Sequence, residues 1–215
     1  MKAVLADGSI VKNGGIVVKN VTGYAMDRLY IGSMGTLVVI TEATFKVTPL
    51  PRAEATVVAN FESVSDAVSA CNMVAAQGLP LLAAEILNHA ACVRLGLDRN
   101  AGKYQLHLRV AGRSSAVSRS IDACTAACRE TGVDTFEMLD GNSSSILWKN
   151  IADLGWESDS PALALRLLGT PAQGAELLAL AESDSLGAVT LSAFRGVVHA
   201  SWASDALPDD VGGYI

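Results

Sequence analysis

A proline pair, Pro49 and Pro51, is the feature of this 215-residue sequence that most constrains its fold. Proline lacks a backbone N–H and has a fixed φ, so two prolines within three residues end a strand or helix that reaches them. The pattern of apolar residues also changes there, from an irregular β-rich segment to a regular alternation of strand-like and helix-like segments. We therefore predict two domains, residues 1–52 and residues 53–215.

The segment after the prolines predicts a ferredoxin-like arrangement followed by a second, shorter round of strands and helices. The first round has the order β-α-β-β-α-β, with strands at 55–61, 81–87, 104–110 and 135–139 and helices at 63–75 and 116–128. The second round has helices at 145–154 and 171–181, a strand at 162–168 and a hairpin made of 189–193 and 197–202. The predicted fold class is α+β with a mostly antiparallel sheet.

The segment before the prolines is predicted to be mainly β structure. A strand at 2–6 is followed by the turn signal Asp7-Gly8 and by a return strand that begins at Ile10. A short helix is expected at 24–30. Residues 37–47 are rich in Val, Ile, Thr and Phe, which predicts one long strand.

The composition argues against several classes of function. The formal net charge of -6 and the sequence pI of about 5.0 disfavour nucleic acid and anionic membrane surfaces as partners. No apolar stretch is long enough for a transmembrane helix, and the apolar start of the chain is too short for a signal peptide. We expect a cytoplasmic protein that reaches the inner membrane surface only through a complex.

Cys124 and Cys128, two of the four cysteines, are spaced to share one face of a helix. They could form a redox or metal-binding pair, or they could be small core residues on an apolar stripe with Val117 and Ile121. Free cysteine is commonly buried, which favours the core interpretation. No cluster of histidines and carboxylates completes a ligand set, so we expect no metal site.

The segment Gly32-Ser33-Met34-Gly35-Thr36 lies between a predicted helix end and a predicted strand. Glycines let the backbone approach a ligand closely, and successive N–H groups in such a turn can bind an anion such as a phosphate. The same residues are also typical of a helix C-cap followed by a tight turn, which is the more common arrangement. Taken alone, the local sequence favours the cap.

The longer segment 18–51 resembles the end of the FAD-binding domain in the vanillyl-alcohol oxidase / p-cresol methylhydroxylase (PCMH) family. The matching pieces are VKNVTGY at 18–24, Leu29, GSxGTL at 32–37, ITEATFKV at 40–47 and the two prolines. The resemblance implies that the first domain is the C-terminal part of a PCMH-type FAD-binding domain, and that the second is the cap that covers the flavin. It implies FAD contacts from Asn20, Thr22, Gly23, Tyr24, Gly32, Ser33, Gly35, Thr36, Val39 and Ile40.

Three departures from the family pattern bear on FAD binding. The Pro-Gly-Gly-type loop of the family's first FAD subdomain is missing, Ala25 replaces the usual Asp, and Val38 replaces a usual Gly. A valine side chain at this position would crowd the adenosine. Because affinity depends on a complete and preorganised site, we expect this chain to be incomplete at both ends and not to hold FAD tightly by itself.

Within the family, the segment is most similar to FAD-binding subunits of bacterial glycolate oxidases. This implies oxidation of a small 2-hydroxy acid such as glycolate, together with a catalytic flavin subunit and an iron–sulfur subunit. Catalytic subunits carry a His-rich motif in the cap, whereas the three histidines of this chain form no such cluster, which favours the accessory subunit. The alternative is a structural or assembly subunit that does not bind FAD. No catalytic base is assigned.

Cationic side chains on the predicted cap strands are the candidate substrate groups. His107 and Arg109 alternate with apolar residues in one strand, and Arg166 and His199 lie between apolar neighbours in later strands. Arg109, Arg166 and His199 together suit the carboxylate of a 2-hydroxy acid. The simpler interpretation, which we favour, is a sheet with one solvated face.

Overall fold

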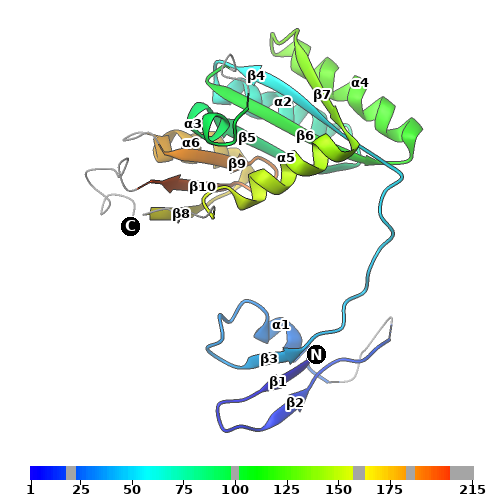
Figure 1. Ribbon diagram of the computed structural model, residues 1–215, viewed down its shortest axis with the longest axis vertical. Helices are drawn as coiled ribbons and strands as arrows, with labels where there is room; N and C mark the ends of the chain where they lie inside the picture. The colour runs from blue at the N-terminus through cyan, green and yellow to red at the C-terminus, as the bar shows by residue number, and fades with distance from the viewer. Residues whose placement is uncertain (18–22, 98–101, 157–162, 183–186, 204–215) are drawn as a thin grey trace. The chain divides into compact units, whose positions relative to one another are not determined.

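The computed structural model describes residues 1–17, 23–97, 102–156, 163–182 and 187–203. These residues form two compact units, Met1–Leu50 and Pro51–Ile215 (Figure 1). Two of the expected cofactor residues, Asn20 and Thr22, lie outside the described residues.

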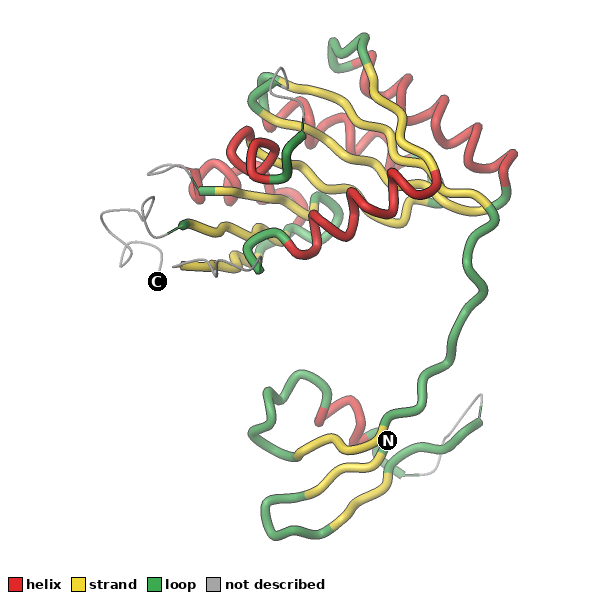
Figure 2. The backbone as a smooth tube through the Cα atoms, in the orientation of Figure 1, coloured by secondary structure: helices red, strands yellow, loops and turns green. Residues whose placement is uncertain are grey.

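The first unit contains a small antiparallel sheet and one short helix. Its elements are β1 (Lys2–Val4), β2 (Ile10–Lys12), α1 (Met26–Tyr30) and β3 (Val39–Glu42), and the strand order is β2-β1-β3. The prediction of one strand over 37–47 is wrong beyond Glu42. The neighbouring strand β1 offers only three residues for pairing, and residues 43–50 belong to no helix or strand (Figure 2).

The first unit buries little apolar surface. Among its described hydrophobic residues, Ala3 and Val38 are buried, whereas large apolar side chains such as Tyr24 and Met34 are more than nine-tenths exposed. All four residues of β3 are exposed. Val38 therefore packs inside the unit.

The second unit is built on a seven-stranded antiparallel sheet with the order β7-β4-β6-β5-β9-β10-β8. In the order β7-β4-β6-β5, its first four strands have the ferredoxin-like arrangement, so the α+β prediction is confirmed. The strands are β4 (Ala53–Phe61), β5 (Leu81–Asn88), β6 (Tyr104–Gly112), β7 (Phe136–Asp140), β8 (Leu163–Leu168), β9 (Ala188–Ser192) and β10 (Val197–Trp202). The helices are α2 (Val64–Ala76), α3 (His89–Arg94), α4 (Ser114–Glu130), α5 (Gly141–Asp153), the 3-10 turn η1 (Pro171–Gln173) and α6 (Gly174–Glu182).

Strand alternation divides the large sheet into an apolar and a polar face. The apolar face packs against α2, α4 and α6 and forms the main core, which includes Val57, Leu108 and Leu191. The polar face is crossed by α5 and carries α3 near the end of β5 (Figure 1). Every second residue of these strands points to this second face. Many of these residues are polar: Thr56, Glu85, His107, Arg109, Ser192 and His199.

All four cysteines are free and buried. Cys71, Cys124 and Cys128 belong to the main core, and burial raises the pKa of Cys128 to about 11. The prediction that Cys124 and Cys128 are core residues is confirmed. A thiol that remains protonated in an apolar core is a poor nucleophile and a poor metal ligand.

Helix α3 was not predicted, because long-range contacts stabilise its first turn. Asn88 is its N-cap, and its side-chain oxygen accepts hydrogen bonds from the backbone N–H of Ala91 (2.9 Å) and of Val189 (3.0 Å). The amide nitrogen of Asn88 donates to the carbonyl of Gly187 (2.9 Å). One buried side chain thus joins the end of β5, the start of α3 and the start of β9.

Candidate functional site

A cavity of about 610 Å³ opens on the polar face of the large sheet, between α5 and the strands β5, β9, β10 and β8. Its lining combines an apolar wall from α5 with charged and hydroxyl groups from the strands. The residues that matter for its chemistry are Glu85, Arg166, Ser192, Arg195 and His199. We call it the first cavity.

Two arginines and one histidine gather around the first cavity. Arg166 of β8 lies directly opposite His199 of β10, and Arg195 lies in the turn between β9 and β10. Partial burial lowers the pKa of His199, and the positive charges of Arg166 and Arg195 lower it further. Among the described residues, no carboxylate forms a salt bridge with these three. The cluster is therefore suited to an anionic ligand.

The sequence predicted two members of this cluster and missed the third. Arg166 and His199 are brought together as expected, on the paired strands β8 and β10, of which β8 is the edge strand of the sheet. Arg195 was missed because it lies in a hairpin turn, where strand alternation gives no signal. Its position four residues before His199, across a tight turn, was the available sequence clue.

Glu85 is a partly buried carboxyl group beside this cluster. Its Oε1 accepts a hydrogen bond from Ser192 Oγ (2.5 Å), and Arg195 Nη2 donates to the same hydroxyl (3.2 Å). Burial raises the pKa of Glu85 to about 7, against the opposing effects of Ser192 and Arg195. The first cavity therefore contains a carboxyl that exchanges a proton near neutral pH.

Arg109, the third cation predicted for the substrate, is engaged elsewhere on the polar face. Its Nη2 lies 2.8 Å from Glu54 Oε1, and its guanidinium lies over the ring of Trp148, 5.6 Å from the centroid. Both side chains of the ion pair are mostly buried. The structure does not place Arg109 among the residues that line the first cavity.

A second cavity of about 380 Å³ lies over the other end of the polar face, near α5, β6, β4 and β7. His107 and Gln105 of β6, Glu137 of β7 and Leu147 of α5 contribute to its lining. His107 is 1% exposed, and both of its ring nitrogens lack a hydrogen-bonding partner among the described residues. Burial lowers the pKa of His107 to about 3.

The predicted cofactor turn is partly consistent with phosphate binding. Gly32 and Gly35 have φ values of 85° and 76°, and a side chain at either position would meet open space. However, Ser33 N–H already donates to Tyr30 O (3.2 Å), and Thr36 donates through both its N–H and its hydroxyl to Ser33 O. The backbone is open to a ligand, but two of the expected N–H donors and the Thr36 hydroxyl are already used.

The remaining expected cofactor residues are exposed wherever they are described. Tyr24, Val39 and Ile40 are 91%, 64% and 43% exposed. Ala25, which replaces the family's Asp, is the N-cap of α1 and has no side-chain oxygen to accept from the helix. Tyr24, Val39 and Ile40 therefore present apolar surface to the solvent.

Two other kinds of site were sought in the described part of the chain. No group of three or more His, Cys, Asp or Glu side chains is placed to hold a metal ion there. None of the helices in the described ranges combines the length and apolar character required to cross a bilayer.

Comparison with known proteins identifies the family. Residues 50–200 match the family model of the C-terminal domain of FAD linked oxidases. The chain therefore belongs to the FAD-linked oxidase family, and the match begins where the second compact unit begins. The resemblance found in the first fifty residues and the family match after them point to the same class of flavin-dependent enzyme.

Curated relatives include proteins named as a glycolate oxidase subunit and as D-lactate dehydrogenases. The chain is 30% identical over 136 residues to "Glycolate oxidase subunit GlcD" of Bacillus subtilis, which covers 60% of this chain and 29% of the relative. It is 28% identical over 157 residues to the mitochondrial "D-lactate dehydrogenase [cytochrome] 1" of Saccharomyces cerevisiae, covering 69% of this chain and 27% of the relative. The matched region is thus less than a third of each of these two relatives.

Solved structures share the fold at low sequence identity. p-Cresol methylhydroxylase aligns with a TM-score of 0.64 at 14% identity, over 95% of this chain and 50% of that one. The 4-ethylphenol oxidase from Gulosibacter chungangensis aligns with a TM-score of 0.63 at 17% identity, over 94% and 50%. These likenesses concern the fold and confirm the PCMH-type architecture.

Proposed function

We propose that the second unit is the substrate-binding cap of an FAD-dependent oxidoreductase that acts on a small 2-hydroxy acid. The observation that carries the proposal is the cluster of Arg166, Arg195 and His199 around the first cavity. Two guanidinium groups can hold a carboxylate through charge-assisted hydrogen bonds. The relatives named as glycolate oxidase and D-lactate dehydrogenase act on compounds of this class.

The roles of individual residues follow from the geometry. Arg166 and Arg195 would hold the carboxylate, while His199 would accept or donate a hydrogen bond at its edge. The α5 wall, with Trp148 and Ile151, would cover the carbon skeleton and limit its size. FAD, when bound, would accept the hydride from the carbon that carries the hydroxyl.

The first unit would contribute to the cofactor site. Gly32 and Gly35 leave room for a diphosphate, and the exposed Tyr24, Val39 and Ile40 would lie against the adenosine. The remaining members of the proposed set are Asn20, Thr22, Gly23, Ser33 and Thr36. In this proposal the chain acts within a larger cytoplasmic assembly, with a catalytic flavin subunit and an iron–sulfur subunit as partners.

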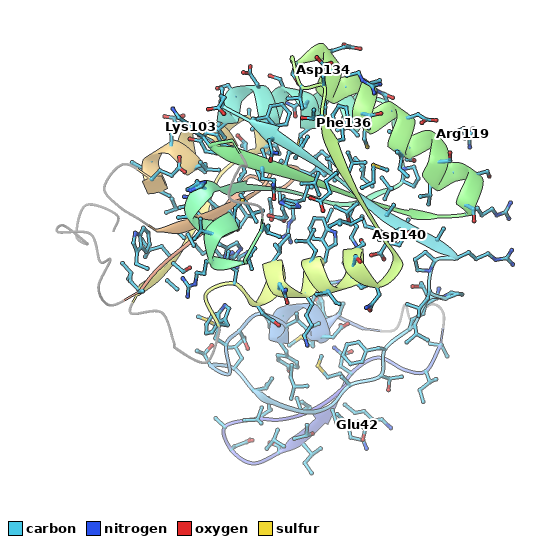
Figure 3. All side chains as sticks on the ribbon, turned by 45° about the horizontal axis from the view of Figure 1, so that its top comes forward. Glu42, Lys103, Arg119, Asp134, Phe136 and Asp140 are labelled. Carbon is cyan, nitrogen blue, oxygen red and sulfur yellow. The ribbon has the colours of Figure 1, made fainter. Side chains whose placement is uncertain are left out.

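The substrate proposal can be tested by calorimetric titration of the chain with glycolate and D-lactate, with glycolamide as an uncharged analogue. Arg166→Gln should weaken binding of the acids by about tenfold or more, because a charged hydrogen bond contributes about 1.5–3 kcal/mol. Arg119→Gln is the matched control, since Arg119 is exposed on α4, on the apolar side of the sheet (Figure 3). Equal affinity for acid and amide, or equal effects of both variants, would contradict the proposal.

A second candidate function is a structural or assembly subunit that does not bind FAD. The observation that favours it is the state of the predicted cofactor turn, in which Ser33 N–H and both donors of Thr36 are already used. Titration of the chain with FAD, followed by absorbance and by flavin fluorescence, separates the two. Saturable binding that is weakened by Gly35→Val supports the cofactor site, and absence of binding supports the scaffold.

A further inference from the structure

Thr190 lies on the polar face of the sheet, among the residues that line the first cavity. It is directly opposite His199 on the paired strands β9 and β10, and His199 is directly opposite Arg166 on β8. Side chains at directly opposed positions of an antiparallel pair point to the same face, with Cβ atoms about 4.5–5.5 Å apart. The three residues therefore form one row across β9, β10 and β8, which lie side by side in Figure 1.

The second arginine of the cavity approaches Thr190 along its own strand. Side chains on one face of a strand are two positions apart, so Ser192 is the next residue after Thr190 on the polar face of β9. Ser192 Oγ accepts a hydrogen bond from Arg195 Nη2 (3.2 Å). Thr190 is thus located between the serine that Arg195 contacts and the histidine that is opposite Arg166.

The hydroxyl of Thr190 is buried without a hydrogen bond. The residue is 6% exposed, and its side chain has no hydrogen-bonding partner within the described ranges. The other buried serines and threonines of these ranges make hydrogen bonds through their hydroxyl groups: Thr56, Ser120, Ser144, Ser192 and Ser201. Because a buried hydroxyl without a partner is costly and Thr190 lines the first cavity, a ligand in this cavity is the partner available to it.

The neighbours of Thr190 suit the two polar groups of a 2-hydroxy acid. Such an acid carries its hydroxyl on the carbon next to the carboxylate, so the protein groups that hold these two parts must be close together. A carboxylate only accepts hydrogen bonds, and guanidinium groups, which only donate them, hold it well. An alcohol both donates and accepts, and so does the hydroxyl of threonine. A free threonine hydroxyl beside two arginines therefore matches the order of groups in the acid.

We propose that Thr190 recognises the 2-hydroxyl group of the substrate, while Arg166 and Arg195 hold its carboxylate. This role rests on the proposed function, because it adds a residue to the same cavity. Its consequence is selectivity between acids. A 2-hydroxy acid satisfies the buried hydroxyl of Thr190, whereas an acid of the same shape that lacks the hydroxyl leaves it without a partner.

Calorimetric titration of the whole chain with D-lactate and with propionate tests the role of Thr190, because propionate is lactate without its hydroxyl. We expect the wild type to bind D-lactate more tightly than propionate. Thr190→Val removes the hydroxyl and keeps nearly the same shape. It should weaken binding of D-lactate by about three- to tenfold and change binding of propionate by less than about twofold.

Two further variants separate loss of the hydroxyl from a change in packing. Thr190→Ser keeps a hydroxyl and should retain the preference for D-lactate. Ser201→Ala is the matched control, because Ser201 also lines the cavity but its hydroxyl already accepts from Arg94 (3.2 Å), so this change should affect both acids equally. Thr190→Val breaks no hydrogen bond within the described ranges, so its midpoint of urea denaturation should stay close to that of the wild type.

Equal losses of D-lactate and propionate affinity in Thr190→Val, or no loss of either, would overturn the role of Thr190. Propionate keeps this role distinct from the proposed function, since it tests the arginines without the hydroxyl. If propionate binds and Arg166→Gln weakens its binding, the proposed function stands even when Thr190→Val has no effect. If neither acid binds to the wild type, the proposed function fails and the role of Thr190 fails with it.

Discussion

Arg109 and Glu54 form a largely buried ion pair at the start of the seven-stranded sheet, with 2.8 Å between Nη2 and Oε1. The ion pair is the first part of a hydrogen-bond network that continues to α5. Ser144 Oγ donates to Glu54 Oε1 (2.9 Å), Thr56 and Ser144 share a hydrogen bond (2.8 Å), and Trp148 Nε1 donates to Thr56 Oγ1 (2.8 Å). This network fixes α5 against β4 and thereby positions the helical wall of both cavities.

Arg109→Gln should destabilise the fold without weakening hydroxy-acid binding. The change leaves Glu54 mostly buried without its cation, and we expect a loss of about 1–3 kcal/mol in the free energy of unfolding. Urea denaturation measures the loss, and Arg119→Gln should change it by less than about 0.5 kcal/mol. A large loss of glycolate affinity in Arg109→Gln would instead place Arg109 at the substrate.

Thr56→Val tests the hydrogen-bond network itself. Thr56 is completely buried, and valine has nearly the same shape but can neither accept from Trp148 nor bond to Ser144. We expect a loss of about 1–3 kcal/mol, since the buried Nε1–H of Trp148 loses its acceptor and Ser144 loses one of its two partners. Thr125→Val on α4, where the hydroxyl bonds only to carbonyls of its own helix turn, should stay within about 0.5 kcal/mol.

Glu85 should give the stability of the protein a characteristic pH dependence. Its pKa is raised from 4.5 to about 7 in the folded state, so between these values the folded state keeps a proton that the unfolded state releases. The contribution is fully present below pH 4.5 and is lost as the pH rises through 7. Thermal unfolding of Glu85→Gln should therefore decline less than that of the wild type across this window. If the unfolding temperatures of the two proteins changed with pH in the same way, the raised pKa of Glu85 would be contradicted.

His107 should contribute with the opposite sign. Its pKa is lowered from 6.5 to about 3, so on acidification the unfolded state gains a proton before the folded state does. Stability from this group is present above pH 6.5 and is lost as the pH falls toward 3. His107→Gln should thus be less sensitive to acid than the wild type. His199→Gln is a useful comparison, because partial burial also lowers the pKa of His199, and there the positive charges of Arg166 and Arg195 lower it further.

Gly196, in the β9–β10 turn, should be much harder to replace than Gly132, which follows α4. Gly196 has a φ of 62°, and a Cβ there would lie 2.4 Å from the carbonyl carbon and oxygen of Thr170. Gly132 also has a positive φ, 88°, but a Cβ there meets nothing within 4 Å. Gly132→Ala should cost about 1 kcal/mol from strain, and Gly196→Ala at least about 2 kcal/mol more from the clash. Similar unfolding midpoints for Gly132→Ala and Gly196→Ala would contradict this prediction, because they would show that the segment around Thr170 moves aside for the new side chain.

The sequence predicted most strands of the seven-stranded sheet because the signals for them are local. Two-residue alternation in β6 and the apolar stripe of α4 are repeated over many residues, and each repeat adds evidence for the same element. The ferredoxin-like order follows from the succession of these elements along the chain. The prediction failed where pairing partners decide the outcome, as in β3, which ends at Glu42 because β1 is short.

The candidate site was only partly visible in the sequence. Alternation indicated that Arg166 and His199 share the polar face, yet it could not show that Arg195 joins them from a turn. The same signal grouped Arg109 with them, although the structure pairs it with Glu54. The pattern of charges along one strand predicts the face on which a side chain lies. It does not predict the neighbours of that side chain, because these come from other strands.

The sequence by itself thus determined the family, the fold class and the polar character of one sheet face, because periodicity and contiguous motifs are encoded within short segments. The tertiary structure decided which polar groups are satisfied and which are left in cavities. Glu85 and His107 are 22 positions apart in the sequence, and their pairing across β5 and β6 depends on strand register. Register is set by the packing of the whole sheet against its helices, which no short segment specifies.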